Sequence, residues 1–427
     1  MDVRRQHRGF SFQSAILKLL PLMNTPEPIL LRSARWLAFA SAVGILLGIA
    51  FSQIFLALAF AALLASGEKL RLPRIWLPLT LFMVGTLVSL AFSGEPAAGL
   101  PQVRKFYVFL ELLVVFSLLR NMRMVRWLFL SWAGIAAIAA IRGGVQFGAK
   151  VNEAHRLGLN FYEYYVGQRI TGFTSHWNTY SAEEMFALIM LSAYLLFASD
   201  IGKRLWVWLA CAAMIALAIL LGETRGIWIA VAVGACYLVW AWRPKLVLLV
   251  PVVILIGYFA SPEALKDRFT SIFKPKGVDS NQFRVVTWRT GIEMIKRHPV
   301  LGLGPEGVKL HFDEYVPEDI PRPLPSGWYG HLHNIYLHYA AERGIPTMLI
   351  LMWLLLQVLF DFWRGLRNLP PGRSDRRFLL HGAIAAVLAT MAEGVVELNL
   401  GDSEVLTMFL VVVACGYLAL EKDLVNA

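Results

Sequence analysis

The sequence predicts an all-α polytopic membrane protein with about twelve transmembrane helices and a large helical loop between spans nine and ten. Of its 427 residues, 57% are hydrophobic and 16% are charged, whereas soluble domains typically carry about 25% charged residues. The apolar residues also form blocks close to the roughly 20 residues that cross a bilayer as a helix. We therefore expect a chain embedded in lipid and in contact with membrane lipids.

Twelve apolar segments of helical length follow one another along the chain. The first two are separated by little more than Phe51 and Ser52, so we expect a tight hairpin there. The predicted spans cover 35–50, 52–66, 75–92, 105–120, 126–141, 178–198, 205–221, 226–242, 246–260, 344–362, 378–396 and 404–420.

These spans divide the chain into four parts. Residues 1–34 begin with the basic run MDVRRQHR and lack a small-residue cleavage site, which indicates an amphipathic segment on the cytoplasmic surface. Spans one to nine occupy 35–260. A loop follows over 261–343, and spans ten to twelve with a short cytoplasmic tail fill 344–427.

The distribution of positive charge predicts the orientation. With both termini in the cytoplasm, 22 of the 40 Lys and Arg residues face inside, and 10 of the other 18 fall within residues 261–334 of the long loop. Long loops follow the positive-inside rule poorly, so the short loops decide the orientation. The long loop and a second loop over about 142–177 are then expected on the outer, periplasmic side.

The net charge of +11 and the three cysteines add little about function. No zinc-ligand spacing or nucleic-acid motif accompanies the charge, so topology and anionic headgroups explain it better than nucleic acid does. The three cysteines lie inside apolar runs and are expected to be buried hydrophobic residues: Cys211, Cys236 and Cys415.

The long loop contains a predicted helix over Gln282–His298. The apolar stripe on this helix should pack against the membrane surface or a cap, and consists of Phe283, Val286, Thr290 and Met294. Arg284 and Trp288 are four residues apart and share another face. Pro299 should end the helix, and Gly302, Gly304 and Pro305 should form a turn.

Three histidines within eight residues follow this turn: His331, His333 and His338. Such histidines are often hydrogen-bonded side chains at a membrane interface. They could also bind a metal, but no adjacent Asp, Glu or Cys completes a site at a familiar spacing, so we predict no metal.

Arginines on the same side of the membrane suggest recognition of phosphate. Arg225 lies at the outer junction of spans seven and eight, and it could simply snorkel beside Glu223. Arg284 and Arg289 add two further cations. The planar guanidinium donates two parallel hydrogen bonds to a phosphate, so arginines beside a histidine suit a diphosphate leaving group and an alcohol nucleophile.

These residues resemble motifs of the O-antigen ligase and O-antigen polymerase superfamily of bacterial envelope glycan transferases. The ligase pattern H-[NSQ]-x9-G-x-x-[GTY] is matched by His333 and Asn334, then nine residues, then Gly344 through Thr347. Upstream, Arg284-x-x-x-Trp288 with Pro299-x-x-Gly302-x-Gly304 is similar to the segment before the family histidine, and Thr224-Arg225-Gly226 is similar to its membrane arginine.

The resemblance implies an inner-membrane enzyme that transfers a polysaccharide from undecaprenyl diphosphate to a sugar hydroxyl of lipid A–core, without cofactor or metal. His333 would be the base and His338 the second choice. Arg225 and Arg284 would bind the diphosphate, helped by Arg289. Further substrate contacts would come from Trp288, His331 and Asn334. Apart from the resemblance, Arg156 and Arg169 in the loop over 142–177 either extend the basic surface toward core phosphates or belong to a solvated loop.

The family also has an acidic residue late in the chain, for which Glu393, Glu397 and Asp402 are the candidates. An O-antigen polymerase or a protein O-oligosaccharyltransferase would use the same donor with another acceptor. A lipid-linked glycan flippase or transporter is the alternative from a different class. Transporters place polar residues near the middle of the membrane and often show matched halves, and neither feature is evident here.

Overall fold

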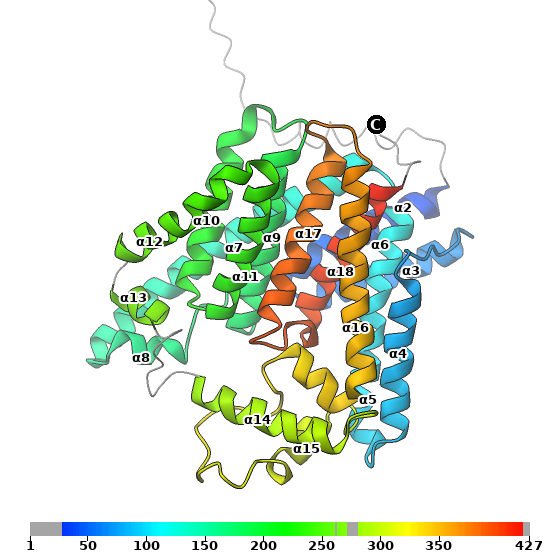
Figure 1. Cartoon of the computed structure of the whole chain (residues 1–427). Helices are drawn as coiled ribbons and strands as arrows, with labels where there is room; N and C mark the ends of the chain where they lie inside the picture. The colour runs from blue at the N-terminus through cyan, green and yellow to red at the C-terminus, as the bar shows by residue number, and fades with distance from the viewer. Residues whose placement is uncertain (1–27, 261–262, 271–280, 422–427) are drawn as a thin grey trace, which may run out of the picture.

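The computed structural model describes residues 28–260, 263–270 and 281–421, which form helices and loops without a β-strand (Figure 1). The predicted all-α class is therefore confirmed. Most of the predicted N-terminal segment 1–34 lies outside the described residues. The first described helix, α2 (Ile29–Gly44), already begins within that segment. The polar side chain of Arg35 finds a partner within this helix bundle, because its Nε donates a hydrogen bond to the Leu118 carbonyl oxygen at 3.2 Å.

Each of the twelve predicted spans lies on helical residues. The corresponding elements are α2, α3 (Ile49–Ala65), α4 (Trp76–Ala91), η3 (Lys105–Phe109) with α6 (Leu110–Leu118), α7 (Met122–Leu157), α9 (Trp177–Phe197), α10 (Leu205–Leu221), α11 (Arg225–Trp242), η5 (Pro244–Leu249) with α12 (Val250–Ala260), α16 (Ile335–Arg367), α17 (Asp375–Glu393) and α18 (Ser403–Leu420).

Among the described residues, six helices are long and apolar enough to cross a membrane: Ile29–Leu47, Met122–Leu157, Trp177–Phe197, Arg225–Trp242, Ile335–Arg367 and Ser403–Leu420. The other predicted spans fall on shorter or less apolar helices. The chain thus has the helices of a membrane protein, whereas the count of twelve spans stays a prediction.

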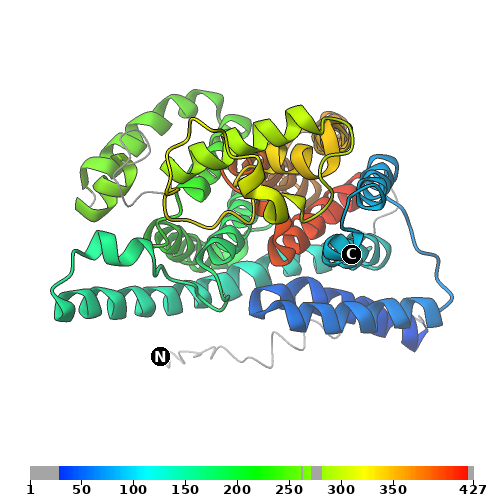
Figure 2. The ribbon, with the colours of Figure 1, turned by 90° about the horizontal axis from the view of Figure 1, so that it is seen from below.

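Helices α9, α17 and α18 form the centre of the bundle, with α7, α10 and α11 on one side and α4 and α6 on the other (Figures 1 and 2). Large side chains such as Phe186 and Phe378 are fully buried between them. The outer helices instead expose apolar side chains, among them Trp206 and Leu248 at 78% each. An exposed apolar belt around a tightly packed centre is expected of a bundle whose solvent is lipid.

The predicted loop over 142–177 is largely helical, which corrects the sequence interpretation. Helix α7 continues to Leu157 and ends at Gly158, whose φ of 65° forms a left-handed C-cap. A short helix, α8 (Phe161–Val166), follows. The end of α7 is polar, and pairs one turn apart such as Lys150 with Glu153 at 3.3 Å keep it helical beyond the apolar part.

The long loop folds as a cap over one end of the bundle, built from α13 (Glu263–Thr270), α14 (Asn281–Arg297), α15 (Gly307–His311) and η6 (Phe312–Glu314) (Figure 1). The predicted helix over Gln282–His298 is confirmed as α14. All four residues of its predicted apolar stripe are buried. Val286 and Met294 belong to a small core of the cap that includes Val308, Phe312 and Leu332.

A kink in α16 joins this cap to the bundle. Gly344 has a φ of 79° and a ψ of 160°, a conformation open essentially to glycine alone. The turn after α14 packs against the kink through backbone hydrogen bonds. Ile345 N donates to Pro299 O at 2.8 Å, and Gly304 N donates to Glu342 O at 2.8 Å. The glycines of the predicted motifs thus allow two backbones to meet. Helix α16 begins at Ile335, and its kink lies at Gly344, the residue at which span ten is predicted to begin.

Gly344→Ala should destabilise the protein by about 3 kcal/mol or more. A Cβ there would lie 1.9 Å from the Val300 carbonyl oxygen, which is backbone and cannot move aside. The thermal unfolding midpoint in detergent should fall by several degrees. The control is Gly134→Ala in α7, where a Cβ meets nothing within 4 Å. Equal midpoints for the two variants would contradict the role of the kink.

Candidate functional site

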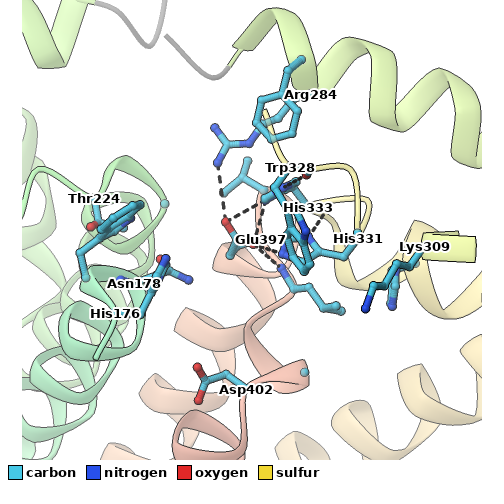
Figure 3. A pocket seen from close by; sticks show the side chains of 18 of the residues that line it. His176, Asn178, Thr224, Arg284, Lys309, Trp328, His331, His333, Glu397 and Asp402 are labelled. Carbon is cyan, nitrogen blue, oxygen red and sulfur yellow. Dashed lines mark hydrogen bonds and ion pairs between the residues drawn. The ribbon is translucent and has the colours of Figure 1, made fainter. Parts of the chain in front are cut away.

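A pocket of ≈ 690 Å³ lies where the cap meets the bundle (Figure 3). It collects residues from segments far apart in the sequence, including the ends of α9, α11 and α18. Six predicted site residues line it: Arg169, Arg225, Arg284, His331, His333 and His338.

His333 is held against a carboxylate from the other side of the pocket. Its Nδ1 lies 3.0 Å and 3.2 Å from the two carboxylate oxygens of Glu397, in the segment after α17. A carboxylate only accepts hydrogen bonds, so Nδ1 carries a hydrogen, which leaves Nε2 as the ring nitrogen that can exchange a proton in the pocket. Nε2 lies 3.5 Å from the Trp328 carbonyl oxygen, which can accept from it once it is protonated.

The backbone around His333 fixes this orientation. His333 has a positive φ of 47°, uncommon for a residue with a side chain. Asn334 follows as the N-cap of α16, and its Oδ1 accepts from the backbone N–H groups of Tyr336 and Leu337. Its Nδ2 donates to Val395 O at 2.8 Å. Asn334 therefore ties the histidine turn to the segment that carries Glu397, and it does not line the pocket.

Glu397 is shared by further polar groups. His331 Nε2 lies 3.7 Å and Arg284 Nη2 lies 3.8 Å from its carboxylate oxygens. Burial alone would raise the pKa of Glu397, but the hydrogen bond and charge of His333, with His331 and Arg284, hold that pKa at about 2. Burial, helped by His333, lowers the pKa of His331 to about 3. At neutral pH the site thus holds a carboxylate and a neutral His331.

Cations gather on the side of the pocket formed by α11, α13 and α14. Arg225, at the first residue of α11, is buried, and Arg284 extends from α14 toward Glu397. Arg169 stacks on Trp177 with its guanidinium carbon 4.7 Å from the ring centroid. Burial, with the charge of Arg268, lowers the pKa of Arg169 to about 9, which still leaves it cationic at neutral pH.

Arg268 is a pocket residue that sequence reasoning missed. It lies on α13, is buried, and donates from Nε to Glu223 O at 2.9 Å. Neither its spacing nor a motif distinguishes it from the other basic residues of the loop. With Arg169, Arg225 and Arg284 it makes four guanidinium groups around one pocket, an arrangement suited to a ligand with two phosphates.

His338, the second candidate base, also lines the pocket but is held differently. It is 3% exposed, and its Nε2 lies 3.3 Å from a carboxylate oxygen of Glu342, four residues later on α16. The pair i, i+4 keeps the ring against its own helix.

The three acidic residues predicted late in the chain, Glu393, Glu397 and Asp402, lie in different surroundings. Glu393 is fully buried in α17 and accepts from Asn399 Nδ2 at 3.1 Å, and it does not line the pocket. Asp402 caps the first turn of α18 and accepts from the Thr179 hydroxyl at 2.6 Å at the pocket edge. Glu397 alone of the three contacts a predicted histidine.

His331, His333 and Glu397 also form a possible metal-ligand set, with ligand atoms within 4.8 Å of one another. We predicted no metal because no acidic residue adjoins the histidines in the sequence, whereas in the structure the acid comes from a distant segment. The guanidinium of Arg284, 3.8 Å from Glu397, already places a positive charge beside this carboxylate. That charge opposes a metal cation at the same position.

The remaining predicted residues lie outside the main pocket. Arg289 is exposed and pairs with Asp319 at 2.8 Å, and Arg156 is exposed near the end of α7. Trp288 donates from Nε1 to His333 O at 3.4 Å and lines a neighbouring groove. This apolar groove, ≈ 280 Å³, is lined by Arg225, Gly226, Ile229, Arg284, Val285, Trp288 and Val396.

The model of the O-antigen ligase family matches residues 209–352. This stretch runs from α10 into α16 and includes the predicted motifs around Arg225, Arg284 and His333, so the resemblance inferred from them is confirmed. Glu397 lies beyond the matched residues. No match to the chain was found among curated proteins.

Arg284→Ala and Arg225→Ala should each weaken binding of a lipid diphosphate by about tenfold to a hundredfold, because each removes charge-assisted hydrogen bonds of about 1.5–3 kcal/mol. The dissociation constant would be measured by titration in detergent. Lys296→Ala is the matched control, since it removes an exposed charge of α14 that pairs with Glu293 outside the pocket. Unchanged constants for both arginine variants would rule out this binding site.

Proposed function

We propose that this chain, assigned to the O-antigen ligase family through residues 209–352, transfers a polysaccharide from undecaprenyl diphosphate to a sugar hydroxyl of lipid A–core. The reaction takes place without a metal, on the periplasmic side of the bacterial inner membrane. Both termini lie in the cytoplasm, and residues 261–343 form the catalytic loop. The charge distribution of the short loops supports this orientation.

The observation that carries the proposal is the pairing of His333 Nδ1 with Glu397 at 3.0 Å in a pocket lined by four arginines. His333 Nε2 takes the proton of the acceptor hydroxyl as its oxygen attacks the anomeric carbon of the donor sugar. The bond from that carbon to the diphosphate oxygen breaks, and undecaprenyl diphosphate leaves. Glu397 holds the ring in the required tautomer and stabilises the imidazolium that forms.

The arginines bind the diphosphate and stabilise the charge that grows on it as it leaves. Arg225 and Arg284 are the primary ligands, since they line both the pocket and the apolar groove beside it. Arg169 and Arg268 extend the positive surface. The polyprenyl tail starts in the apolar groove and continues into the bilayer, so apolar contacts supply binding while the arginines fix the head group.

The direct test is glycan transfer by the purified protein in detergent, with an undecaprenyl-diphosphate-linked glycan, lipid A–core and EDTA. We expect lipid A–core that carries the glycan. A glycan that lengthens on its own carrier would instead identify a polymerase. Loss of activity in EDTA that returns with a divalent metal would show that His331, His333 and Glu397 act as metal ligands.

His333→Ala should lower the transfer rate about 10³-fold, because it removes the general base. His338→Ala should lower the transfer rate less than about tenfold, because His338 is already paired with Glu342 and is not the proposed base. Rates would be measured at saturating substrate, with thermal unfolding of each variant as the folding control. If His338→Ala is the inactive variant, the base assignment is wrong while the reaction class stands.

Glu397→Gln should lower the rate roughly 10²–10³-fold and no more than His333→Ala does, because an amide no longer fixes the tautomer of His333 or balances its charge. Glu393→Gln, one helical turn earlier and outside the pocket, is the matched control and should stay within about twofold. Equal losses in the two variants would mean that the carboxylates act only on stability.

The affinity for the donor should fall as pH rises through 7. Burial raises the pKa of Glu223 to about 7, against the opposing charges of Arg268 and Arg169. Above that pH Glu223 becomes an anion beside these arginines and weakens their hold on the diphosphate. The donor KM should rise roughly fivefold from pH 6 to 8, about 1 kcal/mol of repulsion. In Glu223→Gln this rise should disappear, and an unchanged pH profile would contradict the assignment.

A further inference from the structure

A second set of cations lies on the side of the pocket away from α11. Lys105 on η3 and Lys309 on α15 line the pocket together with Gln102 of α5 (Pro96–Arg104). Figure 3 places Lys309 across His331 and His333 from Thr224, and Figures 1 and 2 place α5 and α11 on opposite sides of the bundle. The mechanism above gives these groups no role.

A narrow apolar slot of ≈ 60 Å³ opens beside this second set. Its walls come from α4, η3, α16 and α18 and include Phe82, Phe109, Leu355 and Phe409. Gln102, Lys105, Tyr339 and Gly401 line both the slot and the main pocket, so the two are continuous. The slot is far smaller than the main pocket of ≈ 690 Å³, so it suits a short stretch of one apolar chain and not a sugar chain.

Arg343 is the unusual residue of the slot. It is 5% exposed, its guanidinium stacks on Tyr339 at 4.2 Å, and its Nε and Nη1 have no hydrogen-bond partner among the described residues. The adjacent Glu342 lies against His338 instead. Leaving charged donors buried without a partner is costly, which indicates that a ligand supplies the acceptor.

We propose that Arg343 and Lys105 form an acceptor subsite, which binds a phosphate of the acceptor glycolipid while one of its acyl chains enters the slot. This inference rests on the proposed function and assigns the two substrates to opposite sides of His333. The donor occupies the arginine side with its tail beside Trp288. The acceptor approaches from α4 and α18 and presents its hydroxyl to Nε2.

Charge and position favour the acceptor over the donor at this subsite. The donor has one diphosphate, and four arginines near α11 already match it. Lipid A–core is a phosphorylated lipid with several acyl chains, so a cation at the mouth of an apolar slot complements it. Lys105 also donates from Nζ to Gly401 O at 3.0 Å, which holds the amine at the junction of slot and pocket.

The test measures the KM of each substrate separately for Arg343→Gln and Lys105→Gln. The acceptor KM should rise about tenfold in each variant, while the donor KM should stay within about twofold. Acceptor from which the phosphates have been removed should show no difference between the variants and wild type. Arg104→Gln, which changes an exposed arginine of α5 outside both cavities, is the matched control. Lys105→Gln keeps the test decisive if Arg343→Gln does not fold.

Binding without transfer separates this inference from the proposed function. The dissociation constant of phosphorylated lipid A would be measured without donor for wild type and both variants. Weaker binding in the variants supports the subsite even if wild type transfers nothing. An unchanged acceptor constant, a rise in the donor KM instead, or equal weakening for phosphatidylglycerol would overturn the proposal, the last by showing a site for bulk lipid.

Discussion

The site depends on the contacts of the partly buried carboxylate of Glu397. It accepts from His333 at 3.0 Å and lies within 4 Å of His331 and Arg284, so it holds two parts of the cap against the end of α17. A buried anion needs such partners, because desolvation would otherwise protonate it. The same charge keeps the Nδ1 hydrogen of His333 in place and leaves Nε2 directed at the pocket. Folding of the cap and orientation of the His333 ring therefore share one contact.

The backbone geometry around this contact explains why the motifs contain glycine and asparagine. Gly344 and Gly304 allow the turn after α14 to meet the kink of α16 at hydrogen-bond distance. Asn334 caps α16 and binds Val395 O, two residues before Glu397. The asparagine and the glycine of the pattern that begins at His333 therefore serve to position the histidine. We propose that the two lipid substrates then reach it from opposite sides, one beside Arg284 and one beside Arg343.

Local pattern predicted much of this architecture. Apolar length predicted the helices, and the stripe from Phe283 to Met294 predicted how α14 packs. The histidines and arginines selected from the sequence include six residues that share one pocket. Long-range geometry could not be predicted. Glu397 lies 64 residues after His333, and nothing in the sequence distinguished it from Glu393 or Asp402 as the partner of the histidine. For the same reason the sequence did not reveal the possible metal-ligand set. Arg268 has no distinguishing neighbour, and the polar end of α7 looked like a loop.

The most direct test of the account is a double-mutant cycle of transfer rate with His333→Ala, Glu397→Gln and the double variant. If Glu397 acts through His333, removing it from a protein that already lacks the histidine should cost nothing further. We therefore predict that the double variant matches His333→Ala within about threefold. Losses that multiply would show that the two residues act independently, and would contradict the central claim that the carboxylate works by holding the base.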